Sequence, residues 1–350
     1  MSVFEHPSFI NHESVHYFCD PAANMRAIVA IHSTALGPAA GGCRLWSYAS
    51  SGDALTDVLR LSRGMSYKSA IAGLALGGGK AVIMKPPGEF DRERLFLAFG
   101  RAVDSLGGKY VTAEDVGCTT NDMEMIARET CHVAGLSKGK AASGDPSPKT
   151  AEGVFLALKI AVARRLKRSD LVGLRVAVQG VGHVGFKLCS LLHEAGAKLI
   201  VSDIDQHDLH RAETEFGARI VSPDAIYDSD VDVFSPCALG AILNMQTLPR
   251  LKAKVVAGAA NNQLADETIG PELMKRGILY APDYVANGGG IINVASEVSG
   301  TYDPHFVQSK ILALGETLTE IFERAEREGR FPGAVADTVA EERLLRARNG

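Results

Sequence analysis

The chain has 350 residues, of which 46% are hydrophobic and 22% are charged, and its formal net charge at neutral pH is −4. The composition is that of a globular protein, and the length predicts two domains because a single hydrophobic core stops growing before this size. The 37 basic and 41 acidic residues form no long run of either sign. We therefore expect neither nucleic acid nor an anionic membrane as a main partner.

No stretch approaches the ~18 apolar residues of a membrane span, and the N-terminus lacks a basic segment followed by an apolar one. We therefore expect a cytoplasmic protein. The six cysteines are scattered and form no CxxC pair. This pattern favours reduced, buried thiols and predicts no metal site, because zinc ligands come in spaced clusters.

The first half of the chain predicts strands and helices in mixed order. Strands are expected at 25–32, 80–85 and 109–115, and a helix is expected at 54–68. Residues 138–150 are small, polar and proline-bearing, which is typical of a crossing between two domains.

The second half alternates more regularly between the two element types. A helix at about 150–165 is followed by a strand at 175–179, a glycine turn and a helix to about 195. Further apolar strands and two long helices follow, at 198–203, 231–236, 253–259, 277–283, 304–328 and 333–348. Strands that are apolar throughout and alternate with helices predict an α/β fold with a parallel sheet covered on both faces.

The segment "GVGHVG" (180–185) directly follows a predicted strand and opens a predicted helix. In this context the first glycine makes the turn, the second lets backbone approach a pyrophosphate, and the third lets helix and strand pack closely. Asp203 ends the next strand, 23 residues after Gly180. A carboxylate there accepts hydrogen bonds from ribose hydroxyls and repels a 2′-phosphate, so the motif predicts NAD rather than NADP as the cofactor.

Two lysines lie in apolar, glycine-rich surroundings. Lys80 follows the glycines at 77–79, and Lys68 shares a helical stripe with apolar residues. Burial and a neighbouring cation both lower the pKa of a lysine, so one of the two could bind a substrate carboxylate while the other acts as a base. Asp115, at the end of a predicted strand, is placed to move protons. The residues alone leave open whether these are snorkelling lysines and a capping aspartate.

Five segments together resemble the leucine, phenylalanine and glutamate dehydrogenase family, and the leucine dehydrogenase branch in particular. They are "TALGPAAGGCRLW" (34–46), "DVLRLSRGMSYKSAIAGLALGGGKAVI" (57–83), "TAEDVG" (112–117), "PSPKTAEGV" (146–154) and "NGGGIINVA" (287–295). The resemblance implies oxidative deamination, in which a branched-chain L-amino acid, NAD⁺ and water give a 2-oxo acid, ammonia and NADH.

The resemblance also implies a role for each matching residue. Lys68 would bind the substrate carboxylate, Lys80 would act as the base, and Asp115 would pass protons. Gly41 and Gly42 would lie against the substrate carboxyl group and the nicotinamide. The implied cofactor-binding residues are Gly180, Gly182, His183, Val184, Gly185, Asp203, Thr150, Ala238, Ala260 and Asn262.

The implied pocket for the substrate side chain is lined by Ala40, Ala113, Ile291 and Val294. Leucine dehydrogenases usually carry leucine where this chain has Ala40, which makes room for a larger side chain. Ile291 replaces a commoner valine and partly refills that space. A phenylalanine- or tryptophan-type dehydrogenase is therefore the alternative substrate class.

The implied architecture is two domains with a cleft. Residues 1–145 would form the substrate-binding and oligomerisation domain, completed by a C-terminal helix at 330–350, and residues 146–329 would form a Rossmann-type NAD-binding domain. The family implies a homo-oligomer, either a dimer or an octamer. Two other function classes are a non-catalytic NAD-binding regulator, for which loss of Lys80 or Asp115 is expected, and a lyase with a Schiff-base lysine.

Overall fold

The computed structural model describes residues 2–137, 144–298 and 300–349. Part of the predicted interdomain crossing, residues 138–143, lies outside the described residues. The chain divides into two compact units. The first comprises Met1–Asp145, Ile291–Phe306 and Ala340–Gly350, and the second Pro146–Gly290 and Val307–Val339. Residues 291–306, expected in the second domain, belong to the first unit. Of the C-terminal helix expected at 330–350 to complete the first domain, residues 340–350 belong to the first unit and residues 330–339 to the second.

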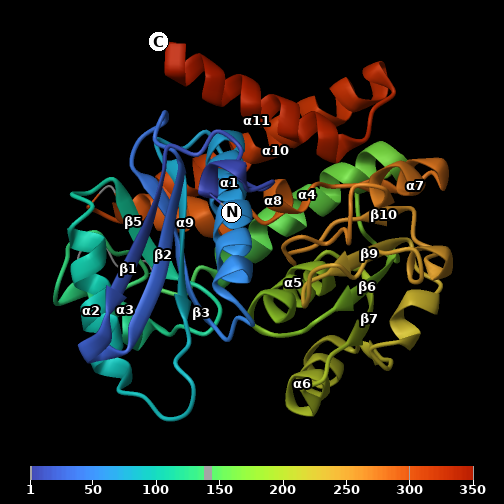
Figure 1. The fold of residues 1–350 in the computed structure, drawn as a ribbon. Coiled ribbons are helices and arrows are strands. Elements are labelled where there is room, and N and C mark those ends of the chain that lie inside the picture. The colour runs from blue at the N-terminus through green and yellow to red at the C-terminus, as the bar shows by residue number, and fades with distance from the viewer. Residues whose placement is uncertain (1, 138–143, 299, 350) are drawn as a thin grey trace. The chain divides into compact units, whose positions relative to one another are not determined.

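The first unit is built on a sheet with the strand order β1-β2-β4-β3-β5 (Figure 1). β1 pairs antiparallel with β2, β2 pairs antiparallel with β4, and β3 pairs parallel with both β4 and β5. The strands are β1 (Ser14–Asp20), β2 (Met25–Ser33), β3 (Ala39–Trp46), β4 (Gly77–Met84) and β5 (Tyr110–Glu114). The helices of this part of the chain are α1 (Ser51–Ile71), α2 (Arg92–Asp104), α3 (Thr120–Ala127) and, continuing from the second unit, α9 (Gly289–Val298).

Helices cover both faces of this sheet. On one face, α1 packs Ala54, Val58 and Leu59 against apolar residues of β2 and β4. On the other face, α2 and α3 contribute the aromatic and aliphatic side chains of a larger core. The sheet is thus the middle layer of three, and a polar side chain on either of its faces lies close to a helix.

The three glycines before Lys80 let neighbouring elements approach β4 closely. A Cβ atom at Gly78 would lie 2.0 Å from the backbone nitrogen of Ser66 on α1. On the opposite face, a Cβ atom at Gly79 would lie 2.7 Å from the ring of Tyr110. Because real Cβ atoms do not approach other atoms so closely, glycine is required at both positions for α1 and β5 to pack as they do.

The second unit is built on a six-stranded sheet with the order β11-β10-β9-β6-β7-β8, and all neighbouring strands in it are parallel. The strands are β6 (Arg175–Gln179), β7 (Lys198–Ser202), β8 (Arg219–Ile220), β9 (Val233–Pro236), β10 (Val255–Val256) and β11 (Leu279–Tyr280). The α/β fold with a parallel Rossmann-type sheet is therefore confirmed.

Helices follow most strands of this sheet, as parallel connections require. They are α4 (Ser147–Leu166), α5 (His183–Glu194), α6 (Gln206–Phe216), α7 (Ile269–Lys275), α8 (Asp283–Ala286), α10 (Pro304–Glu328) and α11 (Pro332–Asn349). Short 3₁₀ helices lie at Val3–Glu5, Pro21–Ala23, Ala225–Asp228 and Leu248–Arg250.

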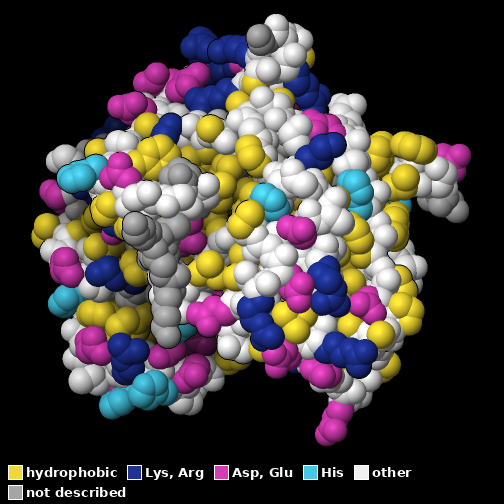
Figure 2. Space-filling model, turned by 90° about the vertical axis from the view of Figure 1, so that its left-hand side faces the viewer, with side chains coloured by type: hydrophobic (Ala, Val, Ile, Leu, Met, Phe, Trp, Pro, Cys, Tyr) yellow, Lys and Arg dark blue, Asp and Glu magenta, His cyan; other side chains and the backbone are white. Residues whose placement is uncertain are grey.

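Charged side chains of both signs are spread over the surface that Figure 2 shows, among hydrophobic ones. Among the described residues, no helix has the length and apolar character needed to cross a membrane.

The glycine requirement predicts opposite effects for two substitutions near α1. Gly78→Ala should lower the free energy of unfolding by about 3 kcal/mol, because the added methyl group overlaps backbone that cannot move aside. Gly64→Ala is the matched control, since no described atom lies within 4 Å of a Cβ atom there. It should stabilise α1 by about 0.5–1 kcal/mol. Urea denaturation measures both, and equal effects would contradict the packing argument.

Candidate functional site

A buried ion pair between Lys80 and Asp115 is the centre of the candidate site. Lys80 lies on β4 opposite Ala30 of β2, on the sheet face that α1 covers, and only 6% of its surface is exposed. Its Nζ atom is 2.8 Å from Oδ2 of Asp115, which directly follows β5. A buried ammonium is strongly destabilised without such a partner, so the carboxylate is what allows a lysine at this position.

The Asp115 carboxyl group is held in its ionised form by two cations. Burial alone raises the pKa of this carboxyl group, but the Lys80 ammonium and the Arg44 guanidinium outweigh burial and leave the pKa below its usual range. Nε of Arg44 donates to the same Oδ2 atom over 3.1 Å. Asp115 is therefore a carboxylate at neutral pH, poised between two proton-bearing groups.

Sequence reasoning missed the residues behind this pair. Arg44, on β3, also donates from Nη1 to Oδ2 of Asp57 on α1, over 2.9 Å. The hydroxyl group of Tyr48 donates to the same Asp57 oxygen over 2.6 Å. The sequence contains one hint of this role, which is that Arg44 lies two residues after the glycine pair Gly41 and Gly42. No periodic pattern links residues 44, 57 and 115.

Lys68 lies in the last turn of α1 and is half-buried. Because α1 packs along β4, the two lysines come from elements that lie against each other. Lys68 thus lies on the helix that covers the sheet face carrying Lys80, and the inward direction of its side chain stays a prediction.

Gly41 and Gly42 lie on β3 beside Asp115. A Cβ atom at Gly42 would lie 2.8 Å from Cβ of Asp115, so a larger residue there would displace the carboxylate. The carbonyl group of Gly41 accepts a hydrogen bond of 2.5 Å from the hydroxyl group of buried Tyr110. The glycine pair is thus fixed from one side by Tyr110 and kept open next to Asp115.

The predicted pocket residues all lie in the first unit, together with the lysines. On the sheet, Ala40 pairs with Gly78 and Ala113 pairs with Gly42, which puts both alanines on the face that carries Lys80. Ile291 and Val294 are one turn apart on the same side of α9.

The glycine loop connects β6 to α5 in the second unit. Gly180 has a φ of +95°, and a Cβ atom at Gly185 would lie 1.9 Å from the carbonyl oxygen of Gly180, so both positions require glycine. At Gly182, the N-cap of α5, no described atom lies within 4 Å of an added Cβ atom, and no described side chain caps the helix. His183 and Val184 begin the helix. The open N-terminus of α5 has the geometry of an anion site.

Asp203 directly follows β7 and holds this loop in place. Its Oδ2 accepts a hydrogen bond of 2.6 Å from the backbone N–H of Val181, and its Oδ1 accepts from the N–H groups of Ile204 and Asp205. Oδ1 already accepts two hydrogen bonds, whereas Oδ2 accepts one and retains acceptor capacity, so these contacts are compatible with a hydrogen bond to a ribose.

The remaining predicted cofactor residues also lie in the second unit. Thr150 is in the first turn of α4, where its hydroxyl group donates to the carbonyl group of Pro146 over 3.1 Å. Ala238 packs directly against Gly180 and follows β9. Ala260 is buried, and Asn262 has a φ of +52° in the loop after β10.

Buried polar atoms at the strand ends support a nucleotide ligand here. Oε1 of Gln179, at the end of β6, and Oγ of Ser202, at the end of β7, are buried without a hydrogen-bond partner in the described structure. In open parallel sheets ligands bind at these carboxyl ends, and the orphaned atoms and the open space at Gly182 fit a dinucleotide. The part of the chain that the structure describes contains no cluster of His, Cys, Asp and Glu suited to a metal ion.

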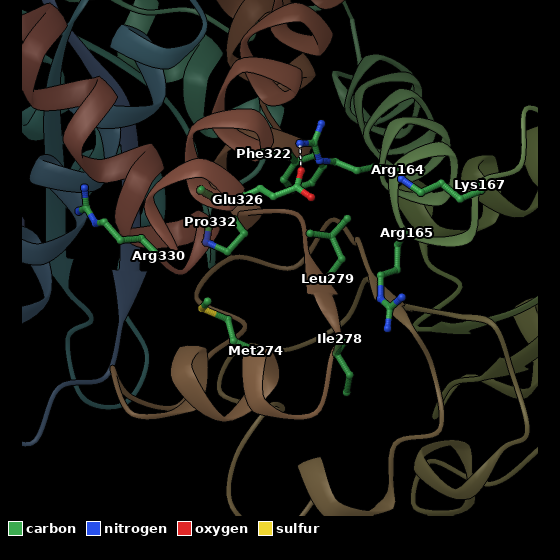
Figure 3. A pocket seen from close by; sticks show the side chains of 12 residues that line it. Arg164, Arg165, Lys167, Met274, Ile278, Leu279, Phe322, Glu326, Arg330 and Pro332 are labelled. Carbon is green, nitrogen blue, oxygen red and sulfur yellow. Dashed lines mark hydrogen bonds and ion pairs between the residues drawn. The ribbon is translucent and has the colours of Figure 1, made fainter.

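A separate pocket of about 460 Å³ lies at the opposite end of the second unit's sheet (Figure 3). Arg164 and Arg165 from the last turn of α4 line it, together with Ile278 and Leu279 at the start of β11. Arg164 is paired with Glu326 of α10. Basic residues at a helix C-terminus complement the exposed carbonyl groups, so the rim has a structural explanation and the pocket is not the candidate site.

Two family models match the chain. One, described as "Glu/Leu/Phe/Val dehydrogenase, dimerisation domain", matches residues 12–132, and the other, described as "Glutamate/Leucine/Phenylalanine/Valine dehydrogenase", matches residues 201–327. The first match contains both lysines and Asp115, and the second contains Asp203.

Similar proteins extend over the whole chain. A leucine dehydrogenase from Thermoactinomyces intermedius is 49% identical over 98% of this chain and 94% of its own. An L-tryptophan dehydrogenase from Nostoc punctiforme is 46% identical over 99% of this chain and 98% of its own. A crystal structure of L-tryptophan dehydrogenase from Nostoc punctiforme matches with a TM-score of 0.85 and 44% identity, covering 97% and 98% of the two chains.

The fold, the buried lysine–carboxylate pair and these matches define an amino-acid dehydrogenase. The chain belongs to the glutamate/leucine/phenylalanine/valine dehydrogenase family, and the resemblance found in the sequence is confirmed.

The environment of the ion pair predicts unequal costs for removing its two members. Asp115→Asn leaves a buried ammonium without its carboxylate and should lower the free energy of unfolding by about 3 kcal/mol at pH 7. Lys80→Met should cost less, about 1 kcal/mol, because Asp115 keeps Arg44 and is partly exposed.

The same pair fixes the sign of the pH effect. Because the pKa of Asp115 is lower in the folded protein, its stabilising effect is complete above the unfolded-state pKa and is lost as the pH falls through the folded-state value. The stability gap between the wild type and Asp115→Asn should therefore narrow below about pH 4. Urea denaturation at pH 7 and pH 3.5 measures this, and a gap that widens in acid would contradict it.

Proposed function

We propose that the protein catalyses the reversible, NAD-dependent oxidative deamination of a branched-chain L-amino acid such as leucine. The observation that carries the proposal is the buried Lys80–Asp115 pair, in the same unit as Lys68, in a chain that is 49% identical to a leucine dehydrogenase. The reaction converts the amino acid, NAD⁺ and water into the 2-oxo acid, ammonium, NADH and a proton.

The first unit supplies the substrate and proton-transfer groups. Lys68 binds the substrate carboxylate as a point charge, and Gly41 and Gly42 let that carboxylate approach the backbone closely. Lys80 accepts the proton of the substrate ammonium group, so that the amine nitrogen can form a double bond to Cα. The bound nicotinamide supplies the hydride acceptor for the Cα hydrogen.

Water then adds to the iminium carbon. Once Lys80 has handed its first proton to Asp115, it removes a second one from the attacking water, which gives a carbinolamine. Asp115, 2.8 Å from Lys80, passes the proton that it received to the amine nitrogen, and it takes up the hydroxyl proton as ammonia leaves and the carbonyl group of the 2-oxo acid forms. The two protons then held by Lys80 and Asp115 are released, one to ammonia and one to solvent. The close contact between the two groups supports this exchange.

The second unit supplies the cofactor site. The open N-terminus of α5 at Gly182 receives the pyrophosphate, and His183, Val184 and Gly185 continue that turn. Asp203 favours NAD because its charge repels a 2′-phosphate. The groups proposed for the nicotinamide and its ribose are Thr150, Ala238, Ala260 and Asn262.

We also propose a homo-oligomer in the cytoplasm. The edge strand β1 and the family description of residues 12–132 as a dimerisation domain support self-association. All six cysteines lie within the described residues as free thiols, which fits a reducing compartment. The other partners are small molecules, namely the amino acid or 2-oxo acid and ammonia.

An aromatic amino acid is the second candidate substrate class. Ala40 leaves more space in the proposed pocket than a leucine at that position would, and an L-tryptophan dehydrogenase is 46% identical to this chain. A non-catalytic regulator would be expected to have lost Lys80 or Asp115, and this chain retains both.

The first test is NADH formation at alkaline pH from leucine, valine, isoleucine, phenylalanine, tryptophan and glutamate. We expect the highest kcat/KM with the branched-chain set, and a much lower value with NADP⁺ in place of NAD⁺. Higher kcat/KM values with phenylalanine and tryptophan would favour the second candidate substrate class. If none of the six amino acids supports NADH formation although the protein binds NADH, a non-catalytic regulator is favoured.

Two lysine substitutions separate the proposed roles. Lys80→Ala should lower kcat by about 10²–10⁴-fold, which is the usual contribution of general-base catalysis, while NADH binding persists. Lys68→Ala should mainly raise KM for the amino acid, because it removes the charge partner of the carboxylate. Steady-state kinetics and NADH fluorescence titration measure both, and a near-normal kcat in Lys80→Ala would refute the base assignment.

Ala40→Leu should increase the preference for leucine over phenylalanine. The added carbons fill the proposed pocket wall, and such a difference is worth ~1–3 kcal/mol in kcat/KM discrimination. Ala102→Leu, a buried alanine of α2 in the opposite core, is a control for overpacking alone. An unchanged preference would mean that position 40 does not line the pocket.

A further inference from the structure

Arg44 joins the proposed proton-transfer pair to a second carboxylate. Its Nε atom contacts Oδ2 of Asp115 over 3.1 Å, and its Nη1 atom contacts Oδ2 of Asp57 over 2.9 Å. The guanidinium thus spans from the end of β5 to α1. Only 23% of the Arg44 side chain is exposed, so these contacts are formed largely away from water.

The same oxygen of Asp115 contacts both Arg44 and Lys80. A contact with Asp57 alone would be enough for Arg44 to link β3 to α1. The additional contact, with the Asp115 oxygen that also contacts the buried lysine, therefore points to a second role. Sharing places two positive groups on one carboxylate. Of the two, Lys80 is the one that can serve as a base, since an arginine stays protonated.

We propose that Arg44 is a positioning residue of the reaction, which fixes Asp115 against Lys80 and keeps its carboxylate ionised while Lys80 releases and accepts protons. The inference rests on the function proposed above. When Lys80 is neutral, Asp115 loses its nearest cation, and without Arg44 the carboxylate would retain the proton that must go on to the leaving amine.

Asp57 and Tyr48 hold Arg44 in this position. The planar guanidinium presents its nitrogen atoms in a fixed geometry, so the Asp57 contact at Nη1 determines where Nε points. Tyr48 donates to the same Asp57 oxygen over 2.6 Å and thereby fixes that carboxylate.

The ionisable groups that interact with Asp115 in the described part of the chain come from several elements. Lys80 on β4 and Arg44 on β3 are its cationic partners, and Tyr110 on β5 and Tyr48 after β3 are neutral hydroxyl groups whose pKa is raised by burial. Behind them lie the remaining groups of the network, which are Asp57, Cys43, Cys118, Arg92 and Asp122. Arg44 is thus the permanent cation in direct contact with Asp115.

The test is the pH dependence of kcat/KM for deamination with saturating NAD⁺ in the wild type and three variants. In Arg44→Gln, loss of a cation beside the pair should shift the ascending limb of the pH profile of kcat/KM to higher pH by about one unit. It should also lower kcat about tenfold or more. Arg44→Lys keeps the charge, so the limb should stay near the wild-type position while kcat falls, because one ammonium cannot hold both carboxylates. Asp57→Asn should lower kcat without an upward shift.

Arg101→Gln is the matched control, because it removes an exposed arginine of the same unit that pairs with Asp20 and Glu129. It should leave both kcat and the profile unchanged. An unmoved limb in Arg44→Gln, or the same shift in Arg44→Gln and Arg44→Lys, would overturn the proposal. If circular dichroism shows that Arg44→Gln does not fold, Arg44→Lys and Asp57→Asn decide, and a wild-type kcat in both would overturn it.

A second measurement separates this inference from the proposed function. If the wild type oxidises none of the amino acids, the proposed function fails, and infrared titration of the Asp115 carboxyl group takes the place of kinetics. The band is assigned by its loss in Asp115→Asn. Its midpoint should lie about one pH unit higher in Arg44→Gln than in the wild type, and equal midpoints would overturn the inference.

Discussion

Burying a lysine ammonium under a helix is the constraint on which the first unit depends. Lys80 occupies a sheet face that α1 covers, where an unpaired charge would be strongly destabilising. The Asp115 carboxylate meets that requirement, and the rest of the arrangement brings the carboxylate there. The glycine at 42 leaves room beside Asp115, and the glycine at 78 lets α1 lie close enough to exclude water.

In the proposed function the two units have different tasks, although their residues alternate along the chain. The first unit is assembled from three stretches of sequence, including 291–306, which carries the proposed pocket residues Ile291 and Val294. The second unit holds the loop at Gly180 and the strand ends around it. Under the proposed assignment, substitutions that change the substrate preference are expected in the first unit, and those that change the cofactor preference are expected in the second.

Regular, strongly apolar elements could be predicted from the sequence, and contacts between distant polar residues could not. The strand at 175–179 was predicted with its observed bounds, because a fully buried parallel strand is apolar throughout. The edge strand β1 was missed because it is only partly buried and mixes polar with aromatic residues. Lys80 and Asp115 could be singled out by their surroundings. Arg44 could not, since its importance arises from a bridge to Asp57 that only the folded chain creates.

The backbone hydrogen bonds that Asp203 accepts have a consequence for engineering. Its carboxylate ties the N–H of Val181 to the end of β7 and also receives two N–H groups of its own turn. These bonds hold the glycine loop in place without a ligand, so the proposed nucleotide binding would require little further ordering of the chain. Replacing Asp203 with a neutral residue, the change expected to admit a 2′-phosphate at the proposed cofactor site, would also remove this anchor. A redesigned loop would therefore need a new acceptor for the Val181 N–H.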